Sequence, residues 1–173
     1  FINSIADVVN SDKAIGDKLK VVFLENYRVS LAERIFPASD LSEQISTAGT
    51  EASGTGCMKF MMNGALTIGT YDGANIEIAE AVGKDNIIIF GLKLEEIEKI
   101  LASGYNPQDY INRSMVLKEI IGLIQSNFFS PDQPNLFAPI LESLFCGDRY
   151  FVCADLDDYC AKQEKASRFY ADK

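Results

Sequence analysis

The spacing of apolar positions changes several times along the chain, and each change predicts a new element. Near the start, apolar residues recur as they do along one face of a helix (Ile2, Ile5, Ala6 and Val9). Residues 20–24 then form a short, mostly apolar run with β-branched side chains. Such a run is typical of a strand buried on both faces, so a buried strand is predicted there. A helix is predicted over residues 30–36, because Pro37 disfavours its continuation.

The middle of the chain alternates between strand-like and helix-like segments. We predict strands at residues 40–45, 65–70 and 87–90, helices at 56–63 and 72–82, and a loop of small and polar residues at 46–56. Strands that alternate with helices indicate βαβ units and an open parallel sheet, whose ligands bind at the carboxyl ends of the strands. The predicted fold class is therefore α/β, a partial Rossmann-like open parallel sheet with flanking helices and three or four strands.

The second half of the chain is mostly helical in its pattern. Apolar stripes with helical spacing occur over residues 94–101, 117–124, 137–145 and 156–166, and a Pro-rich loop interrupts them at residues 130–134. Helical spacing also reaches both ends of the sequence, which begins with Phe1. We therefore expect residues 1–173 to be one part of a larger domain.

Net charge narrows the kinds of partner that the chain can bind. The length of 173 residues fits one domain, and 25 acidic against 16 basic side chains give a formal net charge of −9. Nucleic acids and anionic membranes both require a basic face, so neither is expected as the main partner. No apolar run approaches the roughly 20 residues that a membrane-spanning helix needs.

Histidine and cysteine usage excludes several chemistries. The sequence contains no histidine, which removes every Ser–His or Cys–His catalytic arrangement. Its four cysteines form no CxxC pair, so we expect neither a metal site nor a disulfide framework. Free thiols are typical of a reducing compartment, and the predicted location is the cytoplasm.

One glycine-rich segment stands out as a candidate ligand site. Residues 49–60 read GTEASGTGCMKF, a loop that runs directly into the helix predicted from Gly56. Glycines allow a ligand to approach the backbone closely, and free N–H groups at a helix N-terminus favour a phosphate. Thr55 adds a hydroxyl group, and the amine of Lys59 lies about one turn further along. The segment matches neither a P-loop, which needs Lys at position 55, nor a dinucleotide fingerprint, which needs Gly at position 59.

The residues alone leave two interpretations of this segment. A phosphate-bearing ligand beside a lysine would suit pyridoxal phosphate, which has a phosphate group and an aldehyde that condenses with an amine. A plain surface turn with a solvated lysine is the other interpretation, and it is slightly favoured on physical grounds because glycine-rich loops before helices are common.

Longer matches carry a family resemblance. Residues 51–59, with Met62 and Asn63 after them, closely resemble the cofactor-site signature of the α-glucan phosphorylases that act on glycogen, starch or maltodextrin. Segments at residues 23–33, 40–45, 64–70 and 72–75 resemble the same family, and a looser likeness continues almost to the end. Cys57 stands where the family commonly has Asn, a departure that concerns one local hydrogen bond and leaves the lysine untouched.

The resemblance implies a role for each matching residue of the glycine-rich segment. Lys59 is expected to anchor pyridoxal phosphate covalently, while Thr55 and Gly56 bind the cofactor phosphate, which makes Lys59 and Thr55 the expected catalytic-site residues. Glu51 and Gly54 are expected to contact the glucosyl unit of the substrate; for Glu51 the alternative is a carboxylate at a helix entry. The implied reaction is phosphorolysis, in which an α-1,4-glucan and inorganic phosphate give glucose 1-phosphate.

Other residues have weaker assignments. Tyr27 and Arg28 resemble residues that line the cofactor ring, with a helix-capping role for Arg28 as an equal alternative. Asp72 and Asn75 are predicted as helix-start caps rather than ligands. The resemblance also implies a two-domain glycosyltransferase of the GT-B type that forms a homodimer, with this chain in its C-terminal domain. It further implies that additional basic residues come from elsewhere, so we expect the chain alone to be inactive.

Two other classes of protein are alternatives to a phosphorylase. A nucleotide-sugar glycosyltransferase shares the two-domain architecture, but a nucleotide diphosphate needs no lysine that condenses with an aldehyde. A non-catalytic module would keep the fold as an interaction surface, although the intact segment from Glu51 to Asn63 argues against decay of the site.

Overall fold

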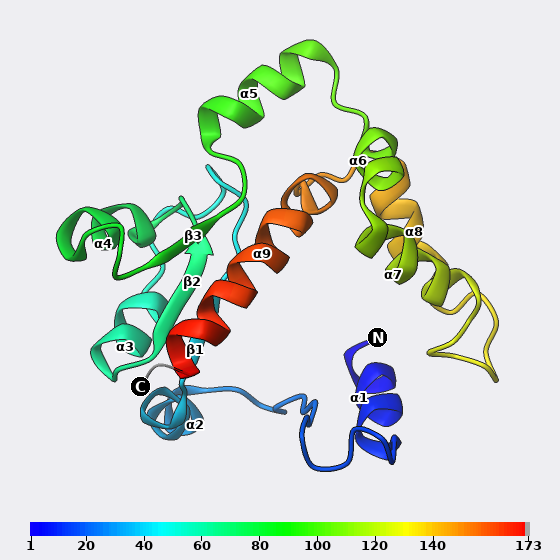
Figure 1. Cartoon of the computed structure of the whole chain (residues 1–173), viewed down its shortest axis with the longest axis horizontal. Helices are drawn as coiled ribbons and strands as arrows, with labels where there is room; N and C mark the ends of the chain where they lie inside the picture. The colour runs from blue at the N-terminus through cyan, green and yellow to red at the C-terminus, as the bar shows by residue number, and fades with distance from the viewer. Residues whose placement is uncertain (172–173) are drawn as a thin grey trace.

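The computed structural model describes residues 1–171 and shows an α/β chain, as the alternating pattern predicted (Figure 1). Three strands are present in this part of the chain: β1 (Leu41–Gln44), β2 (Leu66–Thr70) and β3 (Ile88–Phe90). Helices occupy most of the remainder, and their bounds are α1 (Ile2–Ser11), α2 (Val29–Ile35), the 3-10 turn η1 (Phe36–Ala38), α3 (Gly56–Met62), α4 (Ala74–Val82), α5 (Leu94–Ser103), α6 (Pro107–Arg113), α7 (Met115–Gln125), α8 (Ala138–Phe145) and α9 (Val152–Ala171).

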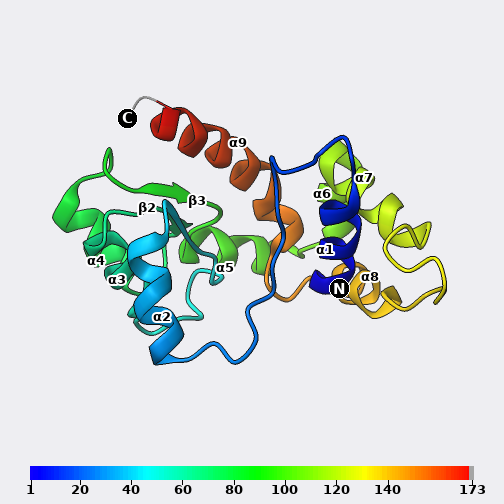
Figure 2. The same ribbon diagram turned by 90° about the horizontal axis from the view of Figure 1, so that it is seen from below.

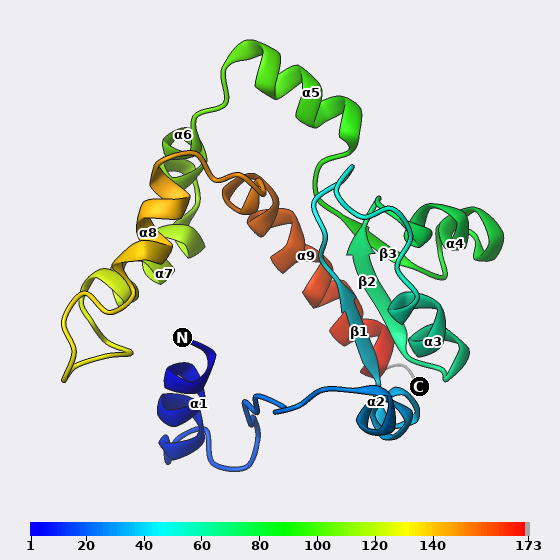
Figure 3. The same cartoon turned by 180° about the vertical axis from the view of Figure 1, so that it is seen from behind.

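The three strands form one open parallel sheet in the order β1-β2-β3. Leu41 pairs with Leu66, and Ile68 pairs with Ile88, so all three carboxyl ends meet at one edge. The helices that connect the strands, α3 and α4, lie on one side of the sheet, and α9 crosses the other side (Figures 1 and 3). The predicted partial Rossmann-like open sheet is therefore confirmed.

Three apolar clusters hold the described part of the chain together, and the third of them joins Ala48, Ile97 and Phe151. In the first, Ile68 and Phe90 of the sheet pack against Ala166 of α9, and all three are buried. The second cluster joins α6, α7, α8 and the start of α9, where its buried members are Ile111, Leu117, Ile121, Ile124, Phe137, Leu141 and Cys153. Figure 2 shows these helices grouped to one side of the sheet, with α9 running from the second cluster to the first.

The strand predicted at residues 20–24 does not form. Val22, Phe23 and Leu24 are 68%, 55% and 45% exposed, and no sheet within residues 1–171 includes them. The backbone of Val21 instead exchanges two hydrogen bonds with the side-chain amide of Asn10, at 2.9 and 2.8 Å. Apolar, β-branched composition favours a strand only where a neighbouring strand completes the ladder, and this segment has no such neighbour here.

The start of α9 was not predicted, and a buried aspartate fixes it. The carboxylate of Asp148 accepts hydrogen bonds from the backbone N–H groups of Val152, at 3.0 Å, and Cys153, at 2.7 Å. It also accepts the hydroxyl of Tyr105 at 2.7 Å. The helix α6 was missed as well; it begins after Asn106, whose side chain accepts from the N–H of Gln108.

Among the helices of residues 1–171, none combines the length and the apolar character that a bilayer crossing requires.

Candidate functional site

The glycine-rich segment lies at the carboxyl edge of the sheet, where open α/β sheets bind their ligands. Its loop part begins after β1, ends at Gly56, the first residue of α3, and takes the conformation that its composition predicted, while residues 56–60 belong to α3. Gly49 and Gly54 have φ angles of 89° and 80°, a region that residues with a Cβ atom adopt rarely. Glycine at positions 49 and 54 therefore allows the loop to adopt this backbone conformation without strain.

Asp72 holds the loop in place from the end of β2. Its carboxylate accepts hydrogen bonds from the backbone N–H groups of Gly49, at 2.8 Å, and Glu51, at 3.0 Å. Burial by itself raises the pKa of Asp72, but hydrogen bonds from Gly49, the hydroxyl of Ser46 and Glu51 lower it by more, so its pKa lies below the ordinary value. The predicted capping role of Asp72 is therefore wrong, because its acceptor atoms face the loop and not the first turn of α4.

The loop also packs directly on the start of α4. The carbonyl oxygen of Ser53 accepts a hydrogen bond from the N–H of Ala74, which satisfies a donor at the N-terminus of that helix. Gly73 makes this approach possible: a Cβ atom there would lie 2.5 Å from the Ser53 oxygen, and the φ angle of Gly73 is 49°. The site thus depends on a glycine outside the glycine-rich segment.

A cavity of about 240 Å³ opens beside the loop. Glu51 and Gly54, the two residues expected to contact a glucosyl unit, both line it together with Cys57 and Asp72. Its other lining residues are Glu43, Gln44, Ile45, Ser46, Ser53 and Asn75. The structure therefore brings the predicted sugar-contacting pair to one cavity, although a hydrogen bond from the N–H of Ser53 turns the carboxylate of Glu51 back onto its own loop.

Asn75 lines the same cavity and is 3% exposed. Its side-chain N–H donates to the carbonyl of Thr70 at 3.0 Å, whereas its oxygen is buried without a hydrogen-bond partner in the described part of the chain. A Cβ atom on Gly69 would lie 2.7 Å from the Asn75 amide, so the strand makes room for this side chain. Asn75 is therefore not the helix-start cap that its position suggested, because its amide bonds back to the strand end.

The side chain of Lys59, on α3, extends toward Phe36 and does not line the cavity beside Glu51. Its amine lies 5.9 Å from the centre of the Phe36 ring, and it forms no ion pair with any side chain of residues 1–171. Phe36 packs edge-on against Phe60, with ring centres 4.6 Å apart. Thr55 is the N-cap residue of α3, but its side chain makes no capping hydrogen bond. The hydroxyl of Thr55 and the amine of Lys59 are therefore both exposed and available to a ligand.

Tyr27 and Arg28 are not brought to this site. Arg28 is the N-cap residue of α2 without a side-chain cap, and both residues are exposed, Tyr27 to 57%. Neither lines the cavity beside Glu51. Their expected position depended on a strand at residues 20–24, and because that strand is absent, the turn that follows it lies elsewhere.

Metal ligands do not gather at the site, because within residues 1–171 no three His, Cys, Asp or Glu residues lie close enough to hold an ion. The residue pattern did not predict that Asp72 would hold the loop of the candidate site. The place of Asp72 directly after a buried strand of a parallel sheet was the signal that could have revealed this role.

The parallel sheet, the glycine-rich loop at its carboxyl edge and the lysine one turn into the next helix define a partial Rossmann-like α/β fold with a candidate ligand site. The sequence matches the model of the carbohydrate phosphorylase family over residues 1–173, and the chain belongs to that family.

The similar curated proteins agree with this assignment. The muscle form of glycogen phosphorylase from Homo sapiens is 58% identical over 170 residues, and so is the muscle form from Mus musculus. The liver form from Homo sapiens is 56% identical over 170 residues. In each case the match covers 98% of this chain but 20% of the relative, so the chain spans about a fifth of the length of these proteins. The resemblance found in residues 51–63 is confirmed at the level of the family.

Proposed function

We propose that this chain carries the cofactor lysine and part of the glucosyl site of an α-glucan phosphorylase. Such an enzyme releases glucose 1-phosphate from an α-1,4-glucan and inorganic phosphate with the help of pyridoxal phosphate. The observation that carries the proposal is the arrangement of Lys59 one turn beyond the loop of residues 49–56, in a chain of the carbohydrate phosphorylase family.

The residues around Lys59 fit pyridoxal phosphate. An amine that condenses with an aldehyde must be free of an ion pair, and Lys59 has none among the described side chains. The apolar ring of Phe36 beside the amine suits an aromatic ligand. The hydroxyl of Thr55 and the backbone N–H of Gly56 lie at the start of α3, where they can donate to the phosphate. When bound, the cofactor supplies a second phosphate group beside that of the substrate.

The glucosyl unit is proposed to bind in the cavity beside Glu51. Carboxylates on loops are frequent sugar ligands because they accept hydroxyl hydrogen bonds. Glu51 lines this cavity, and because one of its carboxylate oxygens accepts from the N–H of Ser53, the other oxygen is the proposed acceptor for a sugar hydroxyl. Gly54 exposes its backbone in the same cavity, and Asp72 fixes the loop that carries both residues. The role of Asp72 is to position the loop, because its oxygens are occupied by backbone donors.

We also propose that the chain does not turn over substrate on its own. Two phosphate groups held close together require several cations to offset their negative charge, and Lys59 is the one lysine or arginine of the loop and α3. A cytoplasmic location, a homodimeric parent enzyme and a role for Tyr27 and Arg28 at the cofactor ring are further predictions from the family.

The decisive experiment treats the chain with pyridoxal phosphate, reduces it with borohydride and maps the adduct by peptide mass spectrometry. We expect a stoichiometric adduct on Lys59. The variant Lys59→Arg should lose it, whereas Lys99→Arg, which changes an exposed lysine of α5, should keep it. An adduct spread over many lysines, or equal labelling of the Lys59→Arg variant, would contradict a built cofactor site.

A further inference from the structure

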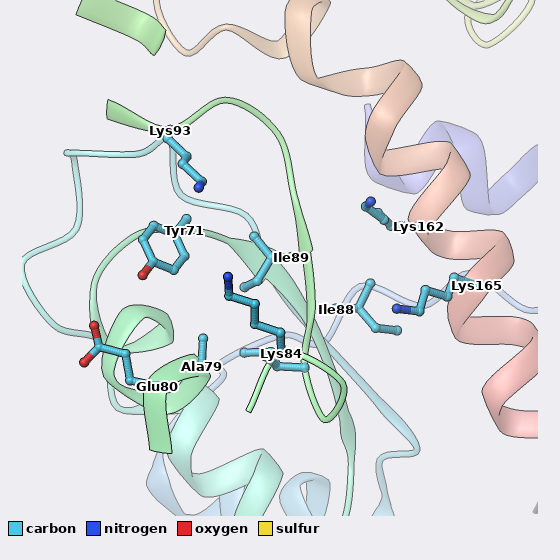
Figure 4. A pocket seen from close by; sticks show the side chains of 10 residues that line it. Tyr71, Ala79, Glu80, Lys84, Ile88, Ile89, Lys93, Lys162 and Lys165 are labelled. Atoms are coloured by element: carbon cyan, nitrogen blue, oxygen red, sulfur yellow. The ribbon is translucent and has the colours of Figure 1, made fainter. Parts of the chain in front are cut away.

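A hollow along the outer edge of β3 gathers four lysines of this acidic chain (Figure 4). It has a volume of about 370 Å³ and shares no lining residue with the cavity beside Glu51. We call it the lysine hollow; its lysines are Lys84, Lys93, Lys162 and Lys165, and its other lining residues are Tyr71, Ala79, Glu80, Ile87, Ile88 and Ile89.

The lysines reach the hollow from separate elements on both sides of the sheet. Lys162 and Lys165 stand three residues apart on α9, which places them on neighbouring positions of one helix face. Lys84 follows α4 on the opposite side, and Lys93 lies between β3 and α5. In the described part of the chain β3 pairs with β2 alone, so the hollow opens along an unpaired strand edge.

Few negative charges offset these lysines. Glu80 provides the one carboxylate that lines the hollow. Lys162 forms an ion pair with Asp158 at 3.6 Å, while the remaining three lysines make no ion pair within residues 1–171. Like charges that are gathered in one hollow repel each other, and a bound anion would relieve that repulsion. The excess is notable because the whole chain has a net charge of −9.

Protection of the strand edge does not account for this arrangement. Lysines on an edge strand do prevent pairing with other chains, but the residues of β3 itself, Ile88–Phe90, are apolar. The lysines come instead from the flanking elements and converge on a hollow with a defined wall. That wall includes Ile89 and the ring of Tyr71, whose centre lies 5.3 Å from the amine of Lys93.

We propose that the lysine hollow binds a small anion with two or more linked phosphate groups. Its volume lies in the range of small-molecule sites. Lysine ammonium groups bind phosphate oxygens as flexible point charges. Because the lysines stand on both sides of the β3 edge, an anion with charge at two centres contacts more of them than a single phosphate does. The ligand is either an inorganic oligophosphate or the phosphate chain of a nucleotide, for which Tyr71 offers a ring to stack on.

The test measures binding of inorganic pyrophosphate to the chain by isothermal titration calorimetry, with sulfate at matched ionic strength as the reference anion. We expect saturable binding of pyrophosphate at least tenfold tighter than that of sulfate. The triple variant Lys84→Gln, Lys93→Gln, Lys165→Gln should weaken it tenfold or more. A matched triple variant at exposed lysines outside the hollow, Lys13→Gln, Lys18→Gln, Lys99→Gln, loses the same charge and should bind as the original chain does. Circular dichroism checks that both variants keep their helix content.

Two further measurements distinguish the lysine hollow from the glycine-rich loop, and a nucleotide from an inorganic oligophosphate as the ligand. Thr55→Val alters the glycine-rich loop and should leave pyrophosphate binding unchanged; if it abolishes binding while the hollow variant does not, the proposal is overturned. A nucleoside diphosphate that binds tighter than pyrophosphate, and loses that advantage in Tyr71→Leu, identifies a nucleotide as the source. Equal affinity for the nucleoside diphosphate and for pyrophosphate identifies an inorganic oligophosphate as the source. Equal weakening in the two lysine triples, or no saturable binding, would also overturn the proposal.

Discussion

The carboxylate of Asp72 accepts a hydrogen bond from the backbone N–H of Gly49 at 2.8 Å, across 23 positions of sequence. With the second bond, from Glu51 at 3.0 Å, it connects the end of β2 to the loop that follows β1. Because a carboxylate in this position can accept only from the loop in one conformation, Asp72 determines where Glu51 and Gly54 stand at the cavity.

The variant Asp72→Asn tests this positioning role. An amide keeps the shape of the side chain but replaces one acceptor oxygen with a donor and removes the charge. Loss of a charge-assisted hydrogen bond to a buried group costs about 2 kcal/mol of unfolding free energy. We expect that loss in urea unfolding at pH 7, together with reduced borohydride-trapped adduct on Lys59. Asp7→Asn, at an exposed position of α1, should change neither quantity. Unchanged stability of Asp72→Asn would show that the loop holds without this carboxylate.

The lowered pKa of Asp72 predicts that the unfolding free energy of the chain depends on pH. The pKa of Asp72 in the folded chain lies below its ordinary value, so the unfolded chain binds the proton more readily. Its contribution to stability is therefore complete above about pH 4, the pKa of an unperturbed aspartate. The contribution is lost as the pH falls through the lower folded pKa. The difference in unfolding free energy between the original chain and Asp72→Asn should therefore shrink as the pH falls below about 4. A difference that stays constant over this range would contradict the assignment.

Gly73 and Gly122 form a matched pair for backbone substitution. At Gly73 an alanine Cβ would meet the Ser53 carbonyl oxygen at 2.5 Å, with a φ angle of 49°. We expect Gly73→Ala to cost about 2 kcal/mol, because the loop must move away from α4. At Gly122, inside α7, an added Cβ meets no atom within 4 Å. Gly122→Ala should therefore stabilise the chain by about 0.5–1 kcal/mol. Chemical denaturation measures the unfolding free energy of both variants. If the two substitutions changed it equally and in the same direction, the close contact at Gly73 would not be the cause.

The contrast between local and distant interactions explains what the sequence could predict. The strands at Leu41–Gln44 and Leu66–Thr70, and the helix from Gly56, follow from apolar periodicity and glycine placement, and their predictions are confirmed. The resemblance of residues 51–63 identified the family, which the comparisons confirm.

The errors concern residues whose role depends on partners far along the chain. The segment at residues 20–24 has the composition of a strand but no strand beside it. Asp72 and Asn75 occupy helix-start positions, yet their side chains bond to the loop and to Thr70. Periodicity reports which side of an element is apolar, and it carries no information about which distant backbone group a buried polar side chain will meet.

The contribution of Asp155 to stability should depend on pH in the opposite direction from that of Asp72, because its pKa is raised and not lowered. Asp155 is 8% exposed near the start of α9, and its carboxylate accepts the N–H of Leu92 at 2.8 Å. Burial raises its pKa to about 6; the hydrogen bond from Leu92 opposes this, and the charges of Asp158, Asp148 and Glu96 add to it. Because the folded pKa lies above that of the unfolded chain, the folded state holds the proton more tightly. Stability should therefore fall as the pH rises from about 4 through 6.

Asp155→Asn imitates the protonated form and keeps an oxygen that can accept from Leu92. We expect it to raise the unfolding free energy at pH 8 by on the order of 1 kcal/mol, less than the full shift implies because solvent reaches part of the carboxylate. Near pH 4 the original chain is itself protonated at this position, so the difference should vanish. Thermal unfolding of the two proteins across this range measures the effect. If the variant were less stable at pH 8, the negative charge of Asp155 would strengthen the hydrogen bond from Leu92 by more free energy than burial of that charge costs.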